Sequence, residues 1–260
     1  MLDAVLARVT EKHDRLASAR PLPEASVRSL RDDFLVRYSH ETTALEGNTL
    51  SLHETQVVLE DGITIGGKLL REHLEVTNAR DALVWLEAVA SSEDPITEST
   101  VLRLHEILMQ GILGLEAGNY RRVPVRIVGS SHMPPNWTIV PHAMMRFTEH
   151  LAMGSNSEHP VIFAARAHIE FAGIHPFVDG NGRVSRMLVN LLLMRAGYPP
   201  ALYLATDRAR YLDAIERAQV DGTDEDFITV TAGAVETMLD RYLQLLELAE
   251  SANPQFDIIP

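Results

Sequence analysis

Cysteine is absent from the 260-residue sequence, which excludes disulfide bonds and thiol chemistry. The sequence also lacks an apolar run of the roughly 18 residues that a membrane span requires. Its strongest apolar run, residues 188–194, is far shorter. The first residues, 1–4, have no basic start and lead into no long apolar stretch, so no secretory signal is predicted. We therefore expect a cytoplasmic protein with no membrane partner.

Positive charge is also scarce. The chain has 23 Lys and Arg against 36 Asp and Glu, which gives a formal net charge of -13, and Lys12 and Lys68 are its only lysines. Nucleic acids and anionic membranes bind basic surfaces. We therefore expect no nucleic-acid partner. An anionic ligand of this chain would need a local concentration of arginine.

Apolar residues recur at helical spacing along most of the chain, which predicts an all-α fold. The predicted helices cover residues 2–16, 24–35, 38–47, 70–90, 97–109, 141–153, 160–174, 183–195, 208–219 and 224–250. One segment differs, because Val123, Val125 and Ile127 alternate with other residues as in an edge strand that contains Pro124. A turn at residues 129–132 would complete a small β-hairpin.

The densest chemistry lies in His175-Pro-Phe-Val-Asp-Gly-Asn-Gly-Arg-Val-Ser-Arg186. Gly180, Asn181 and Gly182 can take the positive backbone angles that point successive N–H groups into one concavity and bind an anion. A helix predicted from Arg183 would add the positive end of its macrodipole. The segment therefore predicts a phosphate site.

The side chains around that concavity suit phosphate chemistry. Asp179 is an oxygen ligand for Mg2+, and Arg183 and Arg186 are three residues apart, so both can reach one helix end. His175 is the side chain best suited to accept a proton at neutral pH. Together they fit transfer from a nucleoside triphosphate. The alternative, a plain loop with Asp179 as a helix cap, needs neither the histidine nor both arginines.

The pattern His-Pro-Phe-x-Asp-Gly-Asn-Gly-Arg-x-x-Arg resembles the signature of the Fic (filamentation induced by cAMP) family, and each defined position is filled. The resemblance implies an all-α Fic/Fido fold with a β-hairpin flap over the active site. It also implies transfer of AMP from ATP, with Mg2+, to a Ser, Thr or Tyr hydroxyl of a protein target, the chain itself included. Removal of AMP, a different nucleotide donor, or a catalytically silent antitoxin-like binding module are the alternatives.

The resemblance assigns a role to each signature residue. His175 takes the proton of the target hydroxyl, Asp179 holds Mg2+, Arg183 binds the inner phosphates, and Arg186 binds the γ-phosphate. Further nucleotide contacts are implied for Gly180, Asn181, Gly182 and Ser185, for Val128, Gly129, Ser130 and Ser131 in the hairpin, and for Tyr211 and Gln219. For Tyr211 and Gln219, a packing or surface role is an equal alternative.

A second motif lies near the N-terminus. Glu46 falls in the last turn of a predicted helix, where a carboxylate opposes the macrodipole, so we expect it to have a cationic partner. Thr42, Glu46 and Gly47 resemble the inhibitory motif of the family, which implies that Glu46 pairs with Arg186 and blocks the γ-phosphate. A solvated glutamate is the alternative.

These assignments divide the chain into three parts. Residues 1–94 form an N-terminal helical region with the inhibitory helix at about 38–47, residues 95–235 form the Fido catalytic domain, and residues 236–260 form the end of the last helix and a loose tail. The resemblance also allows a homodimer. Two other patterns are set aside. Gly62-x4-Gly67-Lys68 has Leu69 where a P-loop needs Ser or Thr, and His168 and Glu170 lie on different helix faces and form no metal site with His175.

Overall fold

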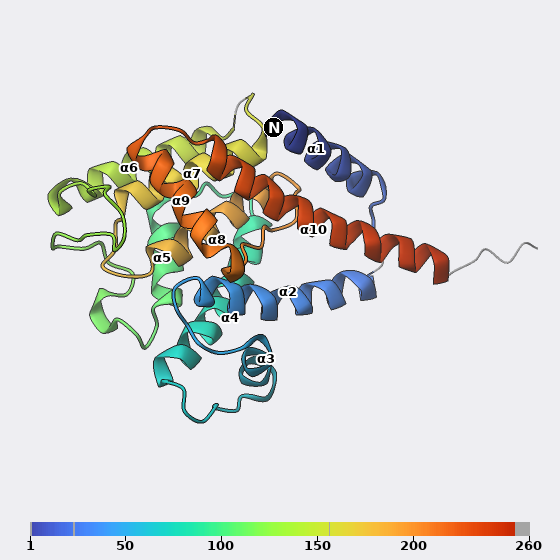
Figure 1. The fold of residues 1–260 in the computed structure, drawn as a ribbon, viewed down its shortest axis with the longest axis horizontal. Helices are drawn as coiled ribbons and strands as arrows, with labels where there is room; N and C mark the ends of the chain where they lie inside the picture. The colour runs from blue at the N-terminus through green and yellow to red at the C-terminus, as the bar shows by residue number, and fades with distance from the viewer. Residues whose placement is uncertain (1, 23, 156, 253–260) are drawn as a thin grey trace, which may run out of the picture.

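The computed structural model describes residues 2–22, 24–155 and 157–252, and within these ranges it contains helices and turns but no strand (Figure 1). The α-helices are α1 (Leu2–Ser18), α2 (Glu24–Ala44), α3 (Leu52–Asp61), α4 (Leu70–Ala90), α5 (Glu98–Leu108), α6 (Val140–Met153), α7 (Pro160–Ile174), α8 (Asn181–Arg195), α9 (Arg208–Val220) and α10 (Glu225–Ala252). Short 3-10 turns, η1 (Gly114–Glu116), η2 (Trp137–Ile139) and η3 (Ala205–Asp207), join them.

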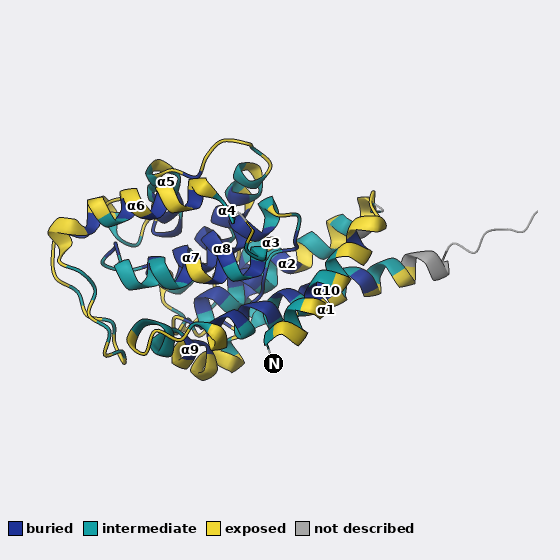
Figure 2. Ribbon diagram, turned by 90° about the horizontal axis from the view of Figure 1, so that it is seen from above, coloured by how far each residue is buried: buried dark blue, intermediate teal, exposed yellow. Residues whose placement is uncertain are grey.

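Helix α8 lies at the centre of the fold, and Figure 2 shows it buried along most of its length. It packs against α7, α4, α5 and α2. Twelve of its 15 residues are buried, including the polar Arg183, Arg186 and Asn190, so the helix is covered on nearly every side. Because α7 is apolar on most of its surface and packs most extensively on α8, the loop between them, residues 175–180, emerges from the core of the protein.

Helices α1, α2 and α10 extend to one side of this core in Figure 1. Helix α1 packs along α10, where Val9 and Leu16 are buried and Glu236 accepts hydrogen bonds from Arg8 and Lys12 at 2.8 and 2.9 Å. Helix α10 also packs on α7 and α9. One apolar core therefore includes residues of α1, α2 and α4 to α10, and Leu50, Val58 and Val76 form a second small cluster between α3 and α4.

Most helix predictions are confirmed, and α4 and α7 have the predicted bounds. The predicted helices 24–35 and 38–47 are instead one helix, α2, because no Gly or Pro interrupts the chain between them. It ends at Ala44, and Gly47 follows in the left-handed conformation at φ +100°. Helix α3 was not predicted, although Ser51 and Glu54 form a capping box at its start.

The predicted β-hairpin over residues 121–132 is wrong, since the described residues there form an irregular loop. A two-stranded ladder needs backbone donors, and Pro124, Pro134 and Pro135 have no N–H. An isolated hairpin without a covering sheet is also marginal in water. We call residues 121–135 the flap loop.

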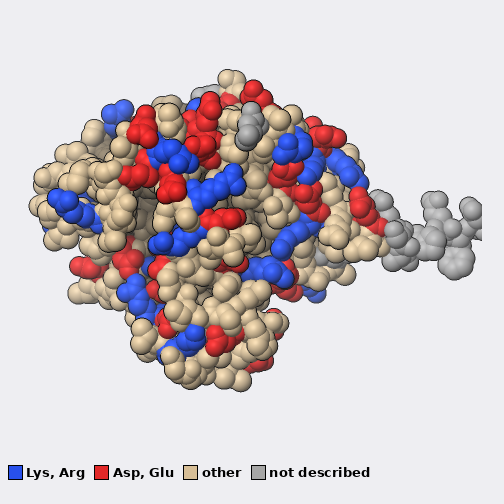
Figure 3. Space-filling model, viewed as in Figure 1, with Lys and Arg blue, Asp and Glu red and all other residues tan. Residues whose placement is uncertain are grey.

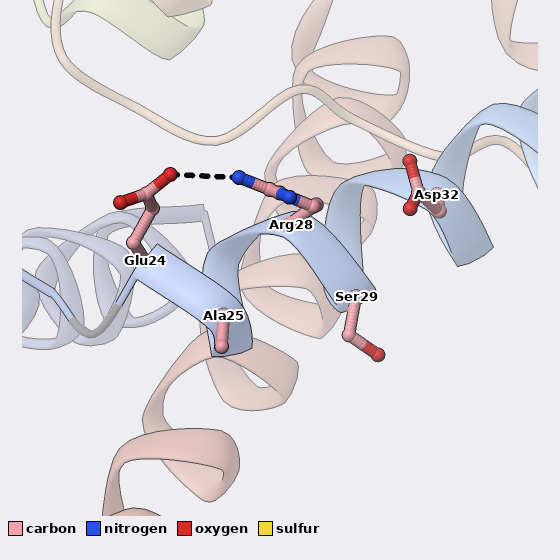
Figure 4. A pocket seen from close by; sticks show the side chains of 5 residues that line it. All are labelled: Glu24, Ala25, Arg28, Ser29 and Asp32. Carbon is pink, nitrogen blue, oxygen red and sulfur yellow. Dashed lines mark hydrogen bonds and ion pairs between the residues drawn. The ribbon is translucent and has the colours of Figure 1, made fainter.

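The surface carries no extended basic patch on the face shown in Figure 3, where acidic and basic side chains are interspersed. No helix of the described residues is long and apolar enough to cross a membrane. A shallow hollow at the outer end of α2 is lined by α2 alone, where Arg28 pairs with Glu24 at 2.7 Å in the open (Figure 4). The hollow has no second wall, so it is not a candidate site.

Candidate functional site

The loop between α7 and α8 has two left-handed residues. His175 closes α7 at φ +49°, and Gly180 precedes α8 at φ +81°. Gly180 is required for space as well, because a Cβ there would lie 2.8 Å from Sδ of Met109. The predicted nest is wrong for Asn181 and Gly182, which are the first two residues of α8. The anion site that remains is the free N–H groups of that first helical turn.

Two aromatic side chains hold the loop in place. Phe177 is fully buried and stacks on His105 of α5, with ring centroids 3.6 Å apart and planes within 1°. His105 also contacts the backbone, since its Nδ1 accepts from Gly118 N at 2.9 Å and its Nε2 donates to Asp179 O at 3.1 Å. Sequence reasoning missed a site role for His105, because its partners are far away in the chain.

Asn181 fastens the same loop from the other side. Its Oδ1 accepts from Phe177 N at 3.0 Å, and its Nδ2 donates to Phe177 O at 2.9 Å. The side chain is buried and both of its ends are already used. Asn181 therefore stabilises the loop rather than acting as a free phosphate donor.

His175 is positioned as a proton acceptor. Its Nδ1 lies 3.4 Å from Ala172 O, an arrangement that favours a proton on Nδ1 and a lone pair on Nε2. Burial lowers the pKa of His175 to about 4, so the imidazole is neutral at pH 7. A neutral imidazole is the form that a general base requires.

Arg121 connects the flap loop to His175. Its guanidinium is buried and donates to His175 O at 2.8 Å, to Pro135 O at 2.6 Å and to Val123 O at 3.2 Å. It thereby joins both ends of the flap loop to the loop between α7 and α8. Sequence reasoning missed this residue, since nothing in its type separates it from the exposed Arg122 beside it.

The tip of the flap loop is the turn at Val128 and Gly129, where Val128 is fully exposed and Gly129 has φ +82°. The hydroxyls of Ser130 and Ser131 both donate to Glu216 of α9, and Ser131 N also donates to it at 2.8 Å. The predicted flap residues, 128–131, thus form one turn that is hydrogen-bonded to α9.

Arg186 is one of the two most deeply buried charges of the site, with 2% of its surface exposed. Its Nε donates to Thr42 Oγ1 at 2.9 Å, and its Nη2 donates to Thr42 O at 2.8 Å and to Glu46 Oε1 at 2.7 Å. The predicted pairing of Glu46 with Arg186 is therefore present. Burial opposes ionisation of Glu46, but the Arg186 charge outweighs it, and the pKa of Glu46 falls below its usual value.

The Glu46 carboxylate also lies directly against the first turn of α8. A Cβ built on Gly182 would collide with Glu46 Oε1 and would come within 3.1 Å of Arg186 Nη1. Only glycine at this position lets the carboxylate approach the helix. Glu46 thus places a negative charge at the helix N-terminus, where a phosphate would otherwise be stabilised.

Asp179 and Arg183 form the other charged part of the site. Asp179 Oδ1 accepts from Gly180 N at 2.6 Å and from Arg183 Nη2 at 3.2 Å. Burial would raise the pKa of Asp179, but the nearby arginines lower it overall, so the carboxylate is ionised at neutral pH. Arg183 is 2% exposed, yet its Nε and Nη1 donate no hydrogen bond. Glu75 is 3.7 Å from Arg183 Nη1.

Three further predicted residues lie around this centre. Tyr211 is buried, and its hydroxyl lies 3.3 Å from Arg186 Nη1 and 2.7 Å from Nε2 of His168, so it supports Arg186. Ser185 bonds inward to His168 and to Gly182 O, which argues against a nucleotide contact. Gln219 has a buried Nε2 without a hydrogen-bond partner, beside Gly173 and the flap loop.

Comparison with known proteins identifies this arrangement. A Fic/DOC family model matches residues 95–193. A protein adenylyltransferase Fic of Drosophila grimshawi is 35% identical over 239 residues, which is 92% of this chain and 49% of that protein. A structure of Fic-1 residues 134–508 from C. elegans has a TM-score of 0.87 at 30% identity and covers 95% of this chain and 73% of its own.

A bacterial structure shares the same fold. A Fic domain containing signaling protein from Bacteroides thetaiotaomicron has a TM-score of 0.81 at 26% identity, and the match covers 94% of this chain and 96% of that one. The chain spans about half the length of the insect relatives that it matches.

The anchoring role of His105 predicts a loss of stability. In His105→Leu, Gly118 N and Asp179 O lose their partner, and each unsatisfied buried group costs about 1–3 kcal/mol. We expect the free energy of unfolding at pH 7 to fall by about 2–4 kcal/mol, measured by urea denaturation. The exposed His53→Leu is the matched control, and an equal effect of both changes would contradict the assignment.

The difference between wild type and His105→Leu should also depend on pH. Burial lowers the folded-state pKa of His105 to about 4 from its ordinary 6.5, so the unfolded chain takes up the proton first as pH falls. The contribution of His105 is therefore complete above pH 6.5 and is lost as pH falls towards 4. The same titration at several pH values measures this, and a gap that widens on acidification would refute it.

Proposed function

Because the chain belongs to the Fic family, we propose that it transfers AMP from ATP to a Ser, Thr or Tyr hydroxyl of a protein, with release of pyrophosphate. The observation that carries the proposal is Arg183, a buried arginine beside the N-terminus of α8 with two nitrogens that lack hydrogen-bond partners. Buried charged groups are normally satisfied. A phosphate chain is a ligand that would satisfy Arg183 and the free N–H groups of α8 together.

The residues present also fit Mg2+. Among the described residues no three His, Asp or Glu side chains gather to hold a metal ion alone. Mg2+ bound with a nucleotide needs only one or two carboxylates, since phosphate oxygens and waters complete its shell. The ionised Asp179 would be that carboxylate. When bound, Mg2+ would neutralise charge on the phosphates.

The chain's own residues would perform the rest of the reaction. The target hydroxyl oxygen forms a bond to the α-phosphorus, and the bond from that phosphorus to the bridging oxygen of pyrophosphate breaks. His175 Nε2 takes the hydroxyl proton. Arg183 and the first turn of α8 would stabilise charge on the phosphates, and Arg186 would hold the γ-phosphate.

The nucleotide base, adenine in ATP, would lie between α9 and the flap loop. The buried Nε2 of Gln219 has no hydrogen-bond partner and is available to a ring nitrogen or carbonyl. Glu216 holds the flap turn beside this position. Adenine is the base that the family favours. A different nucleoside triphosphate would use the same phosphate site.

Glu46 would keep the enzyme inactive in this conformation. Its carboxylate occupies the position beside Gly182 and Arg186 that the γ-phosphate would need. Two anions cannot share that position without strong repulsion. Bound ATP would then be displaced from in-line geometry.

Removal of AMP is the second candidate function. The observation that favours it is the ionised carboxylate of Glu46 at the phosphate position, since it could orient a water for attack on the AMP-modified side chain. A silent binding module is less well supported, because all the signature residues are present.

If His175 is the base, His175→Ala should reduce transfer by roughly 100- to 10,000-fold while ATP still binds. Because its pKa is about 4, the base form should persist at pH 6, and activity should be lost only on further acidification. The assay is labelling of protein by α-labelled ATP across pH. Full activity in the variant would remove His175 from the mechanism.

The metal assignment is tested at Asp179. Asp179→Asn keeps the shape of the side chain but removes its charge. It should raise the Mg2+ concentration needed for half-maximal transfer by about 10- to 100-fold. Mg2+ titrations of the transfer rate measure this change. Turnover that continues unchanged in EDTA would contradict metal-assisted transfer.

Release of the inhibitory contact should activate the enzyme. Glu46→Gly removes a charge-assisted contact, so we expect self-labelling to rise about 10- to 100-fold. The double variant Glu46→Gly with Arg186→Ala should lose this gain, because the two residues act as a pair. Glu24→Gly at the exposed outer end of α2 is the control. Intact mass at fixed MgATP gives the rates, and equal rates for wild type and Glu46→Gly would refute autoinhibition.

A further inference from the structure

Asp179 has a second arginine partner that the proposed mechanism does not use. Its Oδ2 accepts a hydrogen bond from Arg71 Nη2 at 2.6 Å, while Oδ1 is bonded to Gly180 and Arg183. Arg71 is the second residue of α4 and lies 108 residues before Asp179 in the chain. Both carboxylate oxygens are therefore engaged by protein donors.

The two arginines on Asp179 differ in their freedom to move. Arg183 has 2% of its side chain exposed and is fixed by the surrounding core, whereas Arg71 has 51% exposed. An exposed guanidinium can turn into water at little cost in solvation or packing. Arg71 is thus the partner of Asp179 that can leave.

A cation on Asp179 would compete with Arg71. Mg2+ needs a lone pair of the carboxylate at about 2.0–2.1 Å, and on Oδ2 it would lie close to the guanidinium. The two positive charges repel at that separation. Arg71 and Mg2+ would therefore compete for Oδ2.

We propose that Arg71 is a second inhibitory residue, which occupies the metal-binding oxygen of Asp179 and must be displaced before MgATP binds productively. This inference rests on the proposed function, since it takes MgATP as the ligand. It differs from the Glu46 contact in its target, because Glu46 opposes a phosphate and Arg71 opposes the metal ion.

Glu75 offers Arg71 an alternative partner and connects it to the turn that contains Glu46. Arg71 Nε donates to Glu75 Oε1 at 2.9 Å, so Arg71 keeps one partner after it leaves Asp179. Glu75 Oε2 accepts from Asn48 Nδ2 at 2.9 Å. Asn48 is two residues after Glu46, so a displacement of the Glu46 turn would also disturb the partner of Arg71.

The test measures nucleotide binding rather than transfer. Arg71→Met keeps the length of the side chain and removes its charge, and Arg28→Met, from the exposed pair in Figure 4, is the matched control. Both changes are made in the Glu46→Gly background, so that the phosphate position is open. Calorimetry with α,β-methylene ATP is run in excess Mg2+ and in EDTA, and thermal melting verifies that each variant is folded.

We expect Arg71→Met to lower the Kd in Mg2+ about three- to fivefold, the size of one exposed ion pair. In EDTA it should not tighten binding, and Arg28→Met should change neither value. An unchanged Kd in Mg2+ would make Arg71 a surface ion pair and overturn the inference. Weaker binding in both solutions would make it a phosphate ligand and overturn it equally.

Those outcomes leave the proposed function standing, because the nucleotide still binds. Failure of every folded variant, Arg28→Met included, to bind the nucleotide would instead refute the proposed function together with this inference.

Discussion

The site depends on one constraint, the burial of Arg186. A guanidinium removed from water is tolerated only when its N–H groups are satisfied and its charge is balanced. Thr42 from α2, Glu46 from the turn after it and Tyr211 from α9 meet this requirement. The need to satisfy the charge of Arg186 on α8 therefore places α2 and α9 around the loop between α7 and α8.

Under the proposed function, the same constraint lets inhibition and catalysis share Arg186. When Glu46 withdraws, Arg186 loses its counter-ion but keeps the oxygens of Thr42 and Tyr211. A buried cation without a counter-ion is strongly destabilised, and an arriving anion relieves this cost. In the proposed mechanism, the contact between Glu46 and Arg186 thus prepares a position of the right charge for a γ-phosphate. In the same proposal, Arg71 occupies Asp179 in the way that Glu46 occupies Arg186, and Mg2+ would take its place.

Contiguous motifs carried most of what the sequence could predict. His175 to Arg186 is one stretch, so its residue types already suggest a phosphate site. The motif at Thr42 and Glu46 led to the pairing with Arg186. Helix positions followed from apolar spacing, as for α4 and α7. These signals are local, and local signals can be read from a sequence.

The residues that reasoning missed act across long distances in the chain. His105, Arg121 and Arg71 contact the catalytic loop from other elements, and an isolated His or Arg has no pattern that reveals such a partner. The nest was misplaced because α8 begins two residues earlier than its apolar spacing indicates. The predicted hairpin is absent because Pro124, Pro134 and Pro135 lack the N–H donors that a strand ladder needs, despite the alternation of Val123, Val125 and Ile127.

The central claim is that, at the site freed of Glu46, a protein hydroxyl attacks the α-phosphorus of ATP. It is tested most directly by incubation of Glu46→Gly protein, with Mg2+, in two parallel samples of ATP labelled at either the α- or the γ-phosphate. The account predicts that the α-label becomes covalently attached to protein and that the γ-label leaves as pyrophosphate. Attachment of the γ-label, or of neither label by a folded protein that binds ATP, would contradict it.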